Sequence, residues 1–377
     1  MYFQTIYHSN FIMGLKCGIV GLPNVGKSTL FNALSSAKAE AANYPFCTID
    51  PNIGVVNVPD ERLNILAELV NPQRILPTVV EIVDIAGLVK GASNNEGLGN
   101  KFLGDIRETD AILHVVRCFH DDNIIHVAGK VDPVADKEII DTELQLKDLE
   151  SVDKKLLKVA RAAKTGDAKA KKENASLEKF KTHLESGQNA RSIITTEDDL
   201  EAVADLCLLT IKPVIYVANV DEASIINGNE YVEALRNAIK GENAEIVMVS
   251  AAIESEIAVM DSDDEKQMFL AEYGLKESGL NKLIRASYHI LDLITYFTAG
   301  EKEVRAWTIR KGWKAPQAAG VIHSDFERGF IRAEVIKMAD FQKYKTEGAC
   351  KEAGKMSVEG KEYVVGDGDI MHFRFNV

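Results

Sequence analysis

The sequence predicts an α/β fold in which a parallel sheet of the P-loop NTPase type carries a nucleotide-binding site. Three observations support this class. Residues 21–28 read Gly-Leu-Pro-Asn-Val-Gly-Lys-Ser, a complete G-x-x-x-x-G-K-S phosphate loop. A short apolar run at residues 16–20 precedes the loop and a segment with helical apolar spacing follows it, which is the context that the motif requires. Apolar runs alternate with helical segments over residues 14–130 and again after residue 213, as in a parallel sheet covered on both faces.

Each residue type of the phosphate loop has a predicted role. Gly21 and Gly26 allow the backbone to curl so that successive N–H groups point at phosphate oxygens. Lys27 is predicted to place its ammonium on the β- and γ-phosphates, as a candidate catalytic residue, and Ser28 to offer its hydroxyl to Mg²⁺. The start of the following helix adds partial positive charge. The expected phosphate-binding residues are Asn24, Val25, Gly26, Lys27, Ser28 and Thr29.

The predicted domain order begins with an N-terminal extension at residues 1–13, which lacks the pattern of a secretory signal. Residues 14–290 are predicted to form the nucleotide-binding domain, with a helical hairpin inserted at about residues 134–200. Apolar residues at spacings of three and four on both sides of a Thr-Gly-Asp break predict two antiparallel amphipathic helices there. Residues 291–377 alternate apolar and polar side chains, which predicts a small strand-rich module with one helix near residues 340–345.

Composition and charge exclude several classes of protein. No apolar run reaches the ~18–20 residues of a membrane span. The net charge of −13 argues against a protein that coats nucleic acid along its whole surface. Five scattered cysteines without a C-x-x-C pair favour a reducing compartment. We therefore expect a cytoplasmic protein with neither a membrane nor DNA as a partner.

The charge of the predicted hairpin differs from that of the whole chain. Residues 151–191 contain eleven Lys/Arg and five Asp/Glu, a local net charge of +6. Such a run of charge is consistent with an ordinary solvated helix face, and it is also consistent with a surface that contacts RNA. The sequence leaves both interpretations open.

Two further elements predict a nucleotide switch of the translation-factor type. Asp84 ends an apolar strand and is followed three positions later by Gly87, so the carboxylate can serve Mg²⁺ and the Gly87 N–H can sense the γ-phosphate. Thr48 lies about twenty residues after the phosphate loop, a spacing that suits a threonine closing on Mg²⁺. The expected metal ligands are Ser28, Thr48 and Asp84, and the alternative for Thr48 is an ordinary loop residue.

Three stretches carry a resemblance to a known family: residues 21–32, residues 84–89 and residues 315–323. They resemble the YchF, or Obg-like ATPase, family of TRAFAC-class P-loop NTPases, and the similarity extends over residues 14–377. The resemblance implies an OBG-type G domain, an inserted α-helical coiled-coil hairpin and a C-terminal β-grasp module of the TGS type. It also implies a ribosome-associated ATPase that uses Mg²⁺ and has ATP, the ribosome (its large subunit or the whole particle) and rRNA as partners.

The base-reading segment departs from that of a GTPase. GTPases end the corresponding strand with Asn-Lys-x-Asp, whereas this chain has Asn219, Val220, Asp221 and Glu222. A carboxylate moved by one methylene no longer fits the guanine edge, while the Asn219 amide can pair with adenine N6 and N7. We therefore expect ATP to be preferred, with base contacts from Asn219, Glu222 and Ser250. The alternative is that Asp221 restores guanine binding through a one-residue shift.

The residue after Gly87 also departs from the GTPase pattern. Leu88 stands where many GTPases have a water-orienting glutamine, so that route to hydrolysis is absent. The resemblance implies that a histidine on a mobile segment takes this role, which here is His126 as a candidate catalytic residue; a structural histidine is the alternative. Asn24 resembles an asparagine that holds K⁺ in related NTPases. We expect slow hydrolysis that a partner accelerates.

These observations predict a regulatory ATPase that cycles on the ribosome as a translation- or stress-linked switch. Two alternatives remain at this point. One is a GTPase of the same fold. The other is a non-enzymatic platform that binds RNA or the ribosome and holds its nucleotide for structural reasons.

Overall fold

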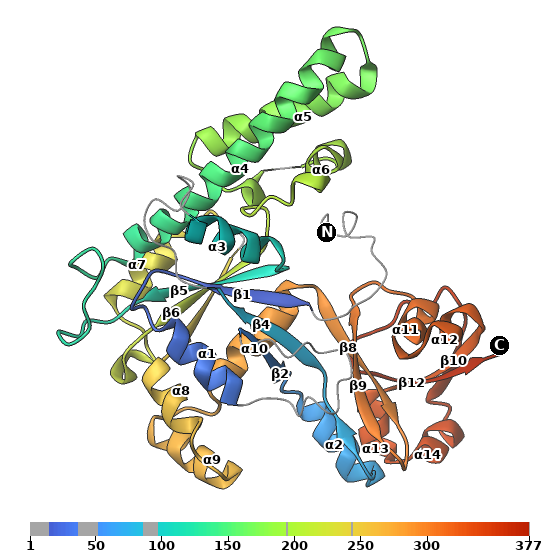
Figure 1. The fold of residues 1–377 in the computed structure, drawn as a ribbon. Coiled ribbons are helices and arrows are strands. Elements are labelled where there is room, and N and C mark those ends of the chain that lie inside the picture. The colour runs from blue at the N-terminus through green and yellow to red at the C-terminus, as the bar shows by residue number, and fades with distance from the viewer. Residues whose placement is uncertain (1–14, 37–51, 86–96, 194, 243, 377) are drawn as a thin grey trace.

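The computed structural model describes residues 15–36, 52–85, 97–193, 195–242 and 244–376 (Figure 1). The predicted N-terminal extension at residues 1–13 lies outside these ranges, as do Thr48, Gly87 and Leu88.

A largely parallel sheet forms the centre of the nucleotide-binding half. Within the described residues it has six strands in the order β2-β4-β1-β5-β6-β7, and only β2 runs antiparallel to its neighbour. All side chains of β5 and β6 are buried, which is why these segments read as continuous apolar runs in the sequence. The predicted α/β class is confirmed. The strands are β1 (Lys16–Val20), β2 (Ile53–Asn57), β4 (Val79–Asp84), β5 (Ala111–Arg117), β6 (Val214–Asn219) and β7 (Glu245–Val249).

Helices lie on both faces of this sheet (Figure 1). Helix α1 begins directly at the end of the phosphate loop, and α10 leads into the C-terminal module. The helices here are α1 (Lys27–Ser36), α3 (Gly97–Arg107), α7 (Glu230–Ala238), α8 (Ala251–Ile257), α9 (Asp263–Glu272) and α10 (Gly279–Ile290), with a short 3-10 turn η5 (Glu222–Ser224) after β6.

The predicted hairpin projects away from the sheet as two long antiparallel helices (Figure 1). They are α4 (Pro133–Lys164) and α5 (Ala168–Glu185). Asp132 caps α4 through the Ala135 N–H, and Asp167 caps α5 through the N–H groups of Lys169 and Ala170. Their facing side chains form a separate apolar core, and α6 (Glu197–Val203) and the turns η3 (Ala190–Ser192) and η4 (Ala204–Leu206) close it at the base.

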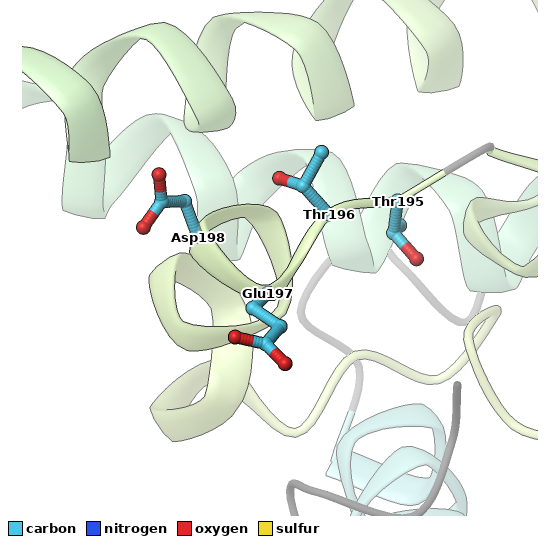
Figure 2. A pocket seen from close by; sticks show the side chains of 4 residues that line it. All are labelled: Thr195, Thr196, Glu197 and Asp198. Carbon is cyan, nitrogen blue, oxygen red and sulfur yellow. The ribbon is translucent and has the colours of Figure 1, made fainter.

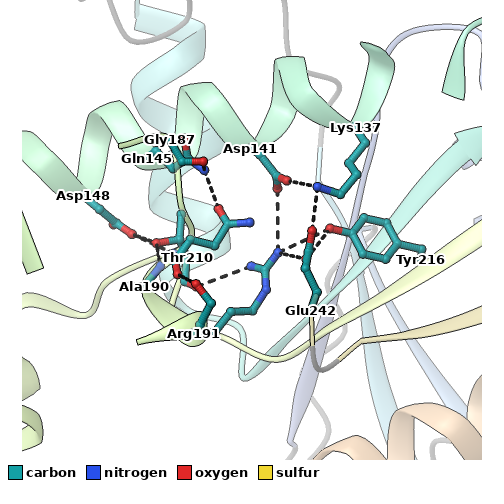
Figure 3. A network of polar contacts seen from close by, with 12 residues as sticks. Lys137, Asp141, Gln145, Asp148, Gly187, Ala190, Arg191, Thr210, Tyr216 and Glu242 are labelled. Carbon is teal, nitrogen blue, oxygen red and sulfur yellow. Dashed lines mark hydrogen bonds and ion pairs between the residues drawn. The ribbon is translucent and has the colours of Figure 1, made fainter. Parts of the chain in front are cut away.

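A buried polar network fixes the base of α4 to the sheet (Figure 3). The Lys137 ammonium lies 2.7 Å from both the Asp141 and the Glu242 carboxylates. Arg191 binds Glu242 at 2.9 Å, and the Tyr216 hydroxyl donates to the same carboxylate at 2.9 Å. Because these groups come from α4, β6, η3 and the turn before β7, the network joins the hairpin to the nucleotide-binding half at one point.

The C-terminal module contains more helix than the sequence predicted. Its sheet has the order β11-β10-β12-β8-β9-β3, in which β3 is Ile75–Leu76 from the first half of the chain. Residues 293–376, all of them described, hold four helices rather than one, since helices of five to eight residues give too few turns for a periodic signal. The helices are α11 (Ala315–Ile322), α12 (Ser324–Arg328), α13 (Met338–Tyr344) and α14 (Glu347–Glu352). The strands are β8 (Leu293–Ala299), β9 (Val304–Arg310), β10 (Phe330–Lys337), β11 (Met356–Glu359) and β12 (Asp369–Phe375).

A segment from the first half of the chain completes this C-terminal module. Strand β3 (Ile75–Leu76) pairs with β9 and forms the edge of its sheet. The preceding helix α2 (Glu61–Val70) packs Leu66 into the same apolar cluster as Phe297 and Val304. Arg62 on α2 also binds Asp367 at 2.7 Å. The two halves therefore share a core, which a sequence boundary at residue 290 does not convey.

Candidate nucleotide-binding site

The phosphate loop leaves β1 and enters α1 with the backbone that the motif predicts. Asn24 and Gly26 have positive φ values of 63° and 98°. A Cβ atom on Gly26 would overlap the side-chain amide of Asn219, so only glycine fits this position. Glycine therefore allows the loop backbone both to curl and to approach β6 closely.

The Lys27 ammonium lies inside the curl of the loop. Its Nζ donates to the Leu22 carbonyl at 3.2 Å, and the side chain is buried. Burial lowers the pKa of Lys27, while the negative charge of Asp84 acts against that shift. Burial likewise raises the pKa of Asp84, and Lys27 opposes this change. The two groups are thus electrostatically coupled at one edge of the sheet.

The described part of the predicted Mg²⁺ site fits a hard cation. Asp84 ends β4 beside Ile19 of β1, and Ser28 is exposed in the first turn of α1. Hydroxyl and carboxylate oxygens are the ligands that Mg²⁺ prefers, and P-loop nucleotide hydrolases use this ion generally. The predicted third ligand, Thr48, and the γ-phosphate sensor, Gly87, lie outside the described residues.

Asn219 holds the phosphate loop as well as lying at the predicted base site. Its Nδ2 donates to the Val25 carbonyl at 2.9 Å, and its Oδ1 accepts from the Ala251 N–H at 3.0 Å. This bracing role was not predicted, because no local sequence pattern links residues 25, 219 and 251. An asparagine amide has two N–H groups and two lone pairs, so one of each remains beyond these bonds. Ser250, directly before α8, has a buried hydroxyl with no partner among the described residues.

The two acidic residues after β6 differ in their surroundings. The Asp221 carboxylate accepts from the Ser224 N–H at 3.0 Å and so caps η5. Glu222 is exposed on that turn, while Val220 before it is buried. Asp221 is thus engaged in the backbone of its own turn, and Glu222 is the carboxylate with freedom to approach a base.

The structure buries His126 against the hairpin. Its Nε2 lies 2.9 Å from Asp136 Oδ2 in the first turn of α4, and its Nδ1 accepts from the Ala128 N–H at 3.2 Å. The Nε2 therefore carries the ring proton and donates a hydrogen bond to Asp136. The family resemblance implied a histidine on a mobile segment, and the contact with Asp136, an acid ten residues away that no motif singles out, was not predicted. The predicted K⁺ ligand Asn24 donates to the neighbouring Ile125 carbonyl at 3.1 Å.

A hollow of about 390 Å³ lies elsewhere, at the start of α6 (Figure 2). Thr195, Thr196, Glu197 and Asp198 line it. The hydroxyl of Thr196 accepts from the Asp199 N–H to cap α6, and Asp198 faces Lys172. Two carboxylates make this hollow unsuitable for an anionic nucleotide, so the phosphate loop remains the candidate site.

Most of the lysines that gave the hairpin its positive charge form ion pairs. Lys154 contacts Glu150, Lys155 contacts Glu173 and Asp205, and Lys169 and Lys172 contact acids of α6. Five further acidic residues at positions 197–205 reduce the local net charge from +6 to +1. Four exposed cations toward the end of the hairpin have no ion pair within the described ranges, and we call them the tip cations: Lys158, Arg161, Lys164 and Lys171.

Among the residues that the structure describes, no helix combines the length and the apolar character needed to cross a membrane.

Comparison with known proteins gives consistent relatives for both halves. Residues 16–162 match a family model described as a 50S ribosome-binding GTPase, and residues 293–376 match YchF-GTPase_C, described as a protein of unknown function (DUF933). The ribosome-binding ATPases YchF of Haemophilus ducreyi and Bacillus subtilis are each 59% identical to the chain, over 97% of it and 100% of their own length. The solved structure of the Schizosaccharomyces pombe YchF GTPase aligns with a TM-score of 0.86 at 44% identity, covering 96% of this chain and 98% of that one. The names of these relatives thus disagree on the nucleotide, because the bacterial proteins are named ATPases and the fission-yeast protein is named a GTPase.

Proposed function

This chain belongs to the YchF family, and we infer from that membership that it is a ribosome-associated ATPase. It binds ATP with Mg²⁺, hydrolyses it slowly to ADP, and acts in the cytoplasm as a translation- or stress-linked switch. One observation carries the nucleotide site: Lys27 and Asp84 lie at the same edge of the sheet, beside a phosphate loop that Asn219 braces. This arrangement supports phosphate binding and the stabilisation of charge during phosphoryl transfer.

We assign the following roles to the chain's own residues. Loop N–H groups of residues 24–29 bind the phosphates, and Lys27 neutralises charge that develops on the γ-phosphate during transfer. Ser28, Thr48 and Asp84 would hold Mg²⁺, which would supply electrostatic stabilisation of the phosphate oxygens. Gly87 senses the γ-phosphate. His126 positions the attacking water in place of the missing glutamine, and Asn24 is the candidate ligand for K⁺.

Two observations support ATP as the preferred nucleotide. The N–H and the lone pair that remain on Asn219 match the N7 acceptor and N6 donor of adenine. Glu222 is the acid in place of the guanine-reading aspartate, and Ser250 directly precedes Ala251, whose N–H donates to the Asn219 amide. The name of the fission-yeast relative, a GTPase, favours the alternative that guanine is accepted.

We expect purified protein to bind a fluorescent ATP analogue about tenfold more tightly than the matching GTP analogue. A mismatched polar edge costs ~1–3 kcal/mol, or about 5- to 150-fold, and the exposed position of Glu222 places the effect near the lower end. The double variant Val220→Lys, Glu222→Asp restores the guanine-reading motif and should raise affinity for GTP. Asp221→Asn is the control and should leave the preference unchanged. Tighter binding of GTP by the unaltered protein would contradict the assignment.

We propose that the tip cations contact rRNA when the protein binds the ribosome. The four cations are exposed and have no acidic partner in the described structure, so they can release counterions from a phosphate backbone. The paired lysines along the hairpin are already neutralised by acids of the chain, which makes them poor candidates for this contact.

Replacing all four tip cations by alanine should weaken ribosome binding and reduce its dependence on salt. Each cation that no longer binds a phosphate should lower the slope of log affinity against log salt by roughly 1. Ribosome pelleting across a NaCl series, at fixed K⁺ and Mg²⁺, measures both quantities. The matched control replaces four paired lysines, Lys154, Lys169, Lys172 and Lys181, and changes the net charge equally. An equal loss of affinity in both variants would show a general charge effect and would rule out contact at the tip.

A further inference from the structure

The loop that carries His126 is held tightly at its start. We call residues 119–131 the His126 loop. The guanidinium of Arg117, at the end of β5, is fully buried and donates to three loop carbonyls: those of Phe119 at 3.1 Å, Asp121 at 3.1 Å and Ile124 at 2.9 Å. These charge-assisted bonds fix the path of the loop up to Ile124. Any rearrangement is thus confined to the residues that follow.

The next two residues of the loop are held from opposite sides. Asn24 of the phosphate loop donates to the Ile125 carbonyl, and Asp136 of the hairpin accepts from the His126 ring. Consecutive residues therefore contact the nucleotide site and the hairpin. This juxtaposition gives the His126 loop a direct physical connection to both.

The bond from Asp136 to His126 is one-sided. Asp136 Oδ2 accepts a hydrogen bond from the ring Nε2–H of His126, whereas Asp136 Oδ1 is buried without a hydrogen-bond partner in the described structure. A buried carboxylate oxygen that lacks a partner is costly, so this arrangement is held less firmly than a fully satisfied one. Burial raises the pKa of Asp136, while the hydrogen bond from His126 opposes that rise. The contact is therefore suited to being broken.

The position of Asp136 depends on the hairpin. It lies in the first turn of α4, directly before Lys137, which the buried network fixes to Glu242 (Figure 3). From that anchor α4 runs on for 27 residues to its end at Lys164, about 40 Å at 1.5 Å per residue. A force on the tip cations would act at the far end of this helix and tilt α4 about its base, where the network holds Lys137 and where Asp148 accepts from the N–H groups of Leu209 and Thr210. Such a tilt would move Asp136 relative to the loop.

We propose that Asp136 is a positioning residue that withholds His126 from the phosphate site, and that a ribosome bound at the hairpin tip tilts α4 and releases it. The inference rests on the proposed role of His126 in positioning water. It explains how a partner contacting the far end of the hairpin can accelerate hydrolysis without contributing a group to the site itself. The conformational change consists of the tilt of one helix, α4, and the loss of one hydrogen bond, that between His126 and Asp136.

Three variants separate this role from ordinary stabilisation of α4. Asp136→Ala removes the acceptor, and Asp136→Asn keeps a neutral one. Asp132→Ala removes the acid that caps the same helix without contacting His126. We expect Asp136→Ala to raise basal ATP hydrolysis at least fivefold and to lower the ribosome-stimulated ratio by the same factor. Asp136→Asn should lie between, and Asp132→Ala should leave both rates unchanged.

The location of His126 is measured independently by NMR of its ring. The Nε2–H proton is hydrogen-bonded and buried, so it should exchange slowly with water in the unaltered protein and be lost in Asp136→Ala. Combining Asp136→Ala with alanine at the tip cations tests the order of events. Because release occurs after tip contact, the combined variant should keep the raised basal rate.

The outcomes are distinct. Continued slow exchange of the ring proton in Asp136→Ala would overturn the inference, whatever happens to hydrolysis. A fall in both basal and stimulated rates would also overturn it, since Asp136 would then orient His126 for catalysis. Loss of the proton signal with no change in hydrolysis, matched by an unaffected His126→Ala variant, would support the restraint and contradict only the catalytic role of His126.

Discussion

Replacing Lys27 by alanine is expected to lower the rate of ATP hydrolysis by about 10²- to 10³-fold. Its ammonium lies within the phosphate loop and is the buried cation coupled to Asp84. Removing one preorganised group that stabilises charge in a transition state typically costs this much. Affinity for ATP should also fall, since the lysine charge contributes to binding as well as to transfer. Phosphate release under single-turnover conditions, at saturating nucleotide, separates the two effects.

The matched control for this variant is Lys240→Ala, which removes one positive charge from the surface. It should leave hydrolysis unchanged. Circular dichroism and thermal unfolding establish that the Lys27→Ala protein is folded. A folded Lys27→Ala protein that keeps its hydrolysis would remove the assigned role of the lysine. A folded, inactive protein that still performs its cellular role would instead favour the non-enzymatic platform.

The parts of this site that the sequence predicted are those in which neighbouring residues cooperate. The phosphate loop, its flanking strand and helix, and Asp84 at the end of β4 all follow from patterns within a few residues. Buried strands can be recognised in the sequence as apolar runs, because both faces of a parallel sheet are covered. The hairpin was also predictable, since its helices are long enough for many periods of apolar spacing.

The parts that could not be predicted depend on contacts across the chain. Asn219 braces Val25 from 194 positions away. Asp136 accepts from His126 across a loop of irregular backbone, and β3 joins a sheet whose other strands begin more than 200 residues later. The net charge of the hairpin surface was overestimated for the same reason, because acids that pair with Lys155, Lys169 and Lys172 lie in η4 and α6, beyond the stretch in which charge was counted. Local sequence carries no signal for such pairings.

The buried network at the base of α4 should make Glu242 the most costly acidic residue to remove. This single carboxylate serves Lys137, Arg191 and Tyr216. Burial alone would raise its pKa, yet Arg191 and Lys137 lower it below its usual value. The charge of Glu242 is thus balanced by two cations that have little access to water, and deleting it leaves an excess of positive charge in the interior.

We expect Glu242→Ala to destabilise the protein by about 3 kcal/mol, the lower end for breaking a buried ion pair, because the side chain remains 16% exposed. The thermal transition of the nucleotide-binding half should fall by roughly 6–12 °C. Glu242→Gln keeps an acceptor and should lose less. The control is Glu245→Ala, an exposed glutamate at the start of β7 that should shift the transition little.

Since the network holds the base of α4, Glu242→Ala should also weaken the hydrogen bond between His126 and Asp136 and raise basal hydrolysis, an effect that Glu245→Ala should not reproduce. A destabilised Glu242→Ala protein with an unchanged hydrolysis rate would separate the anchor from the switch.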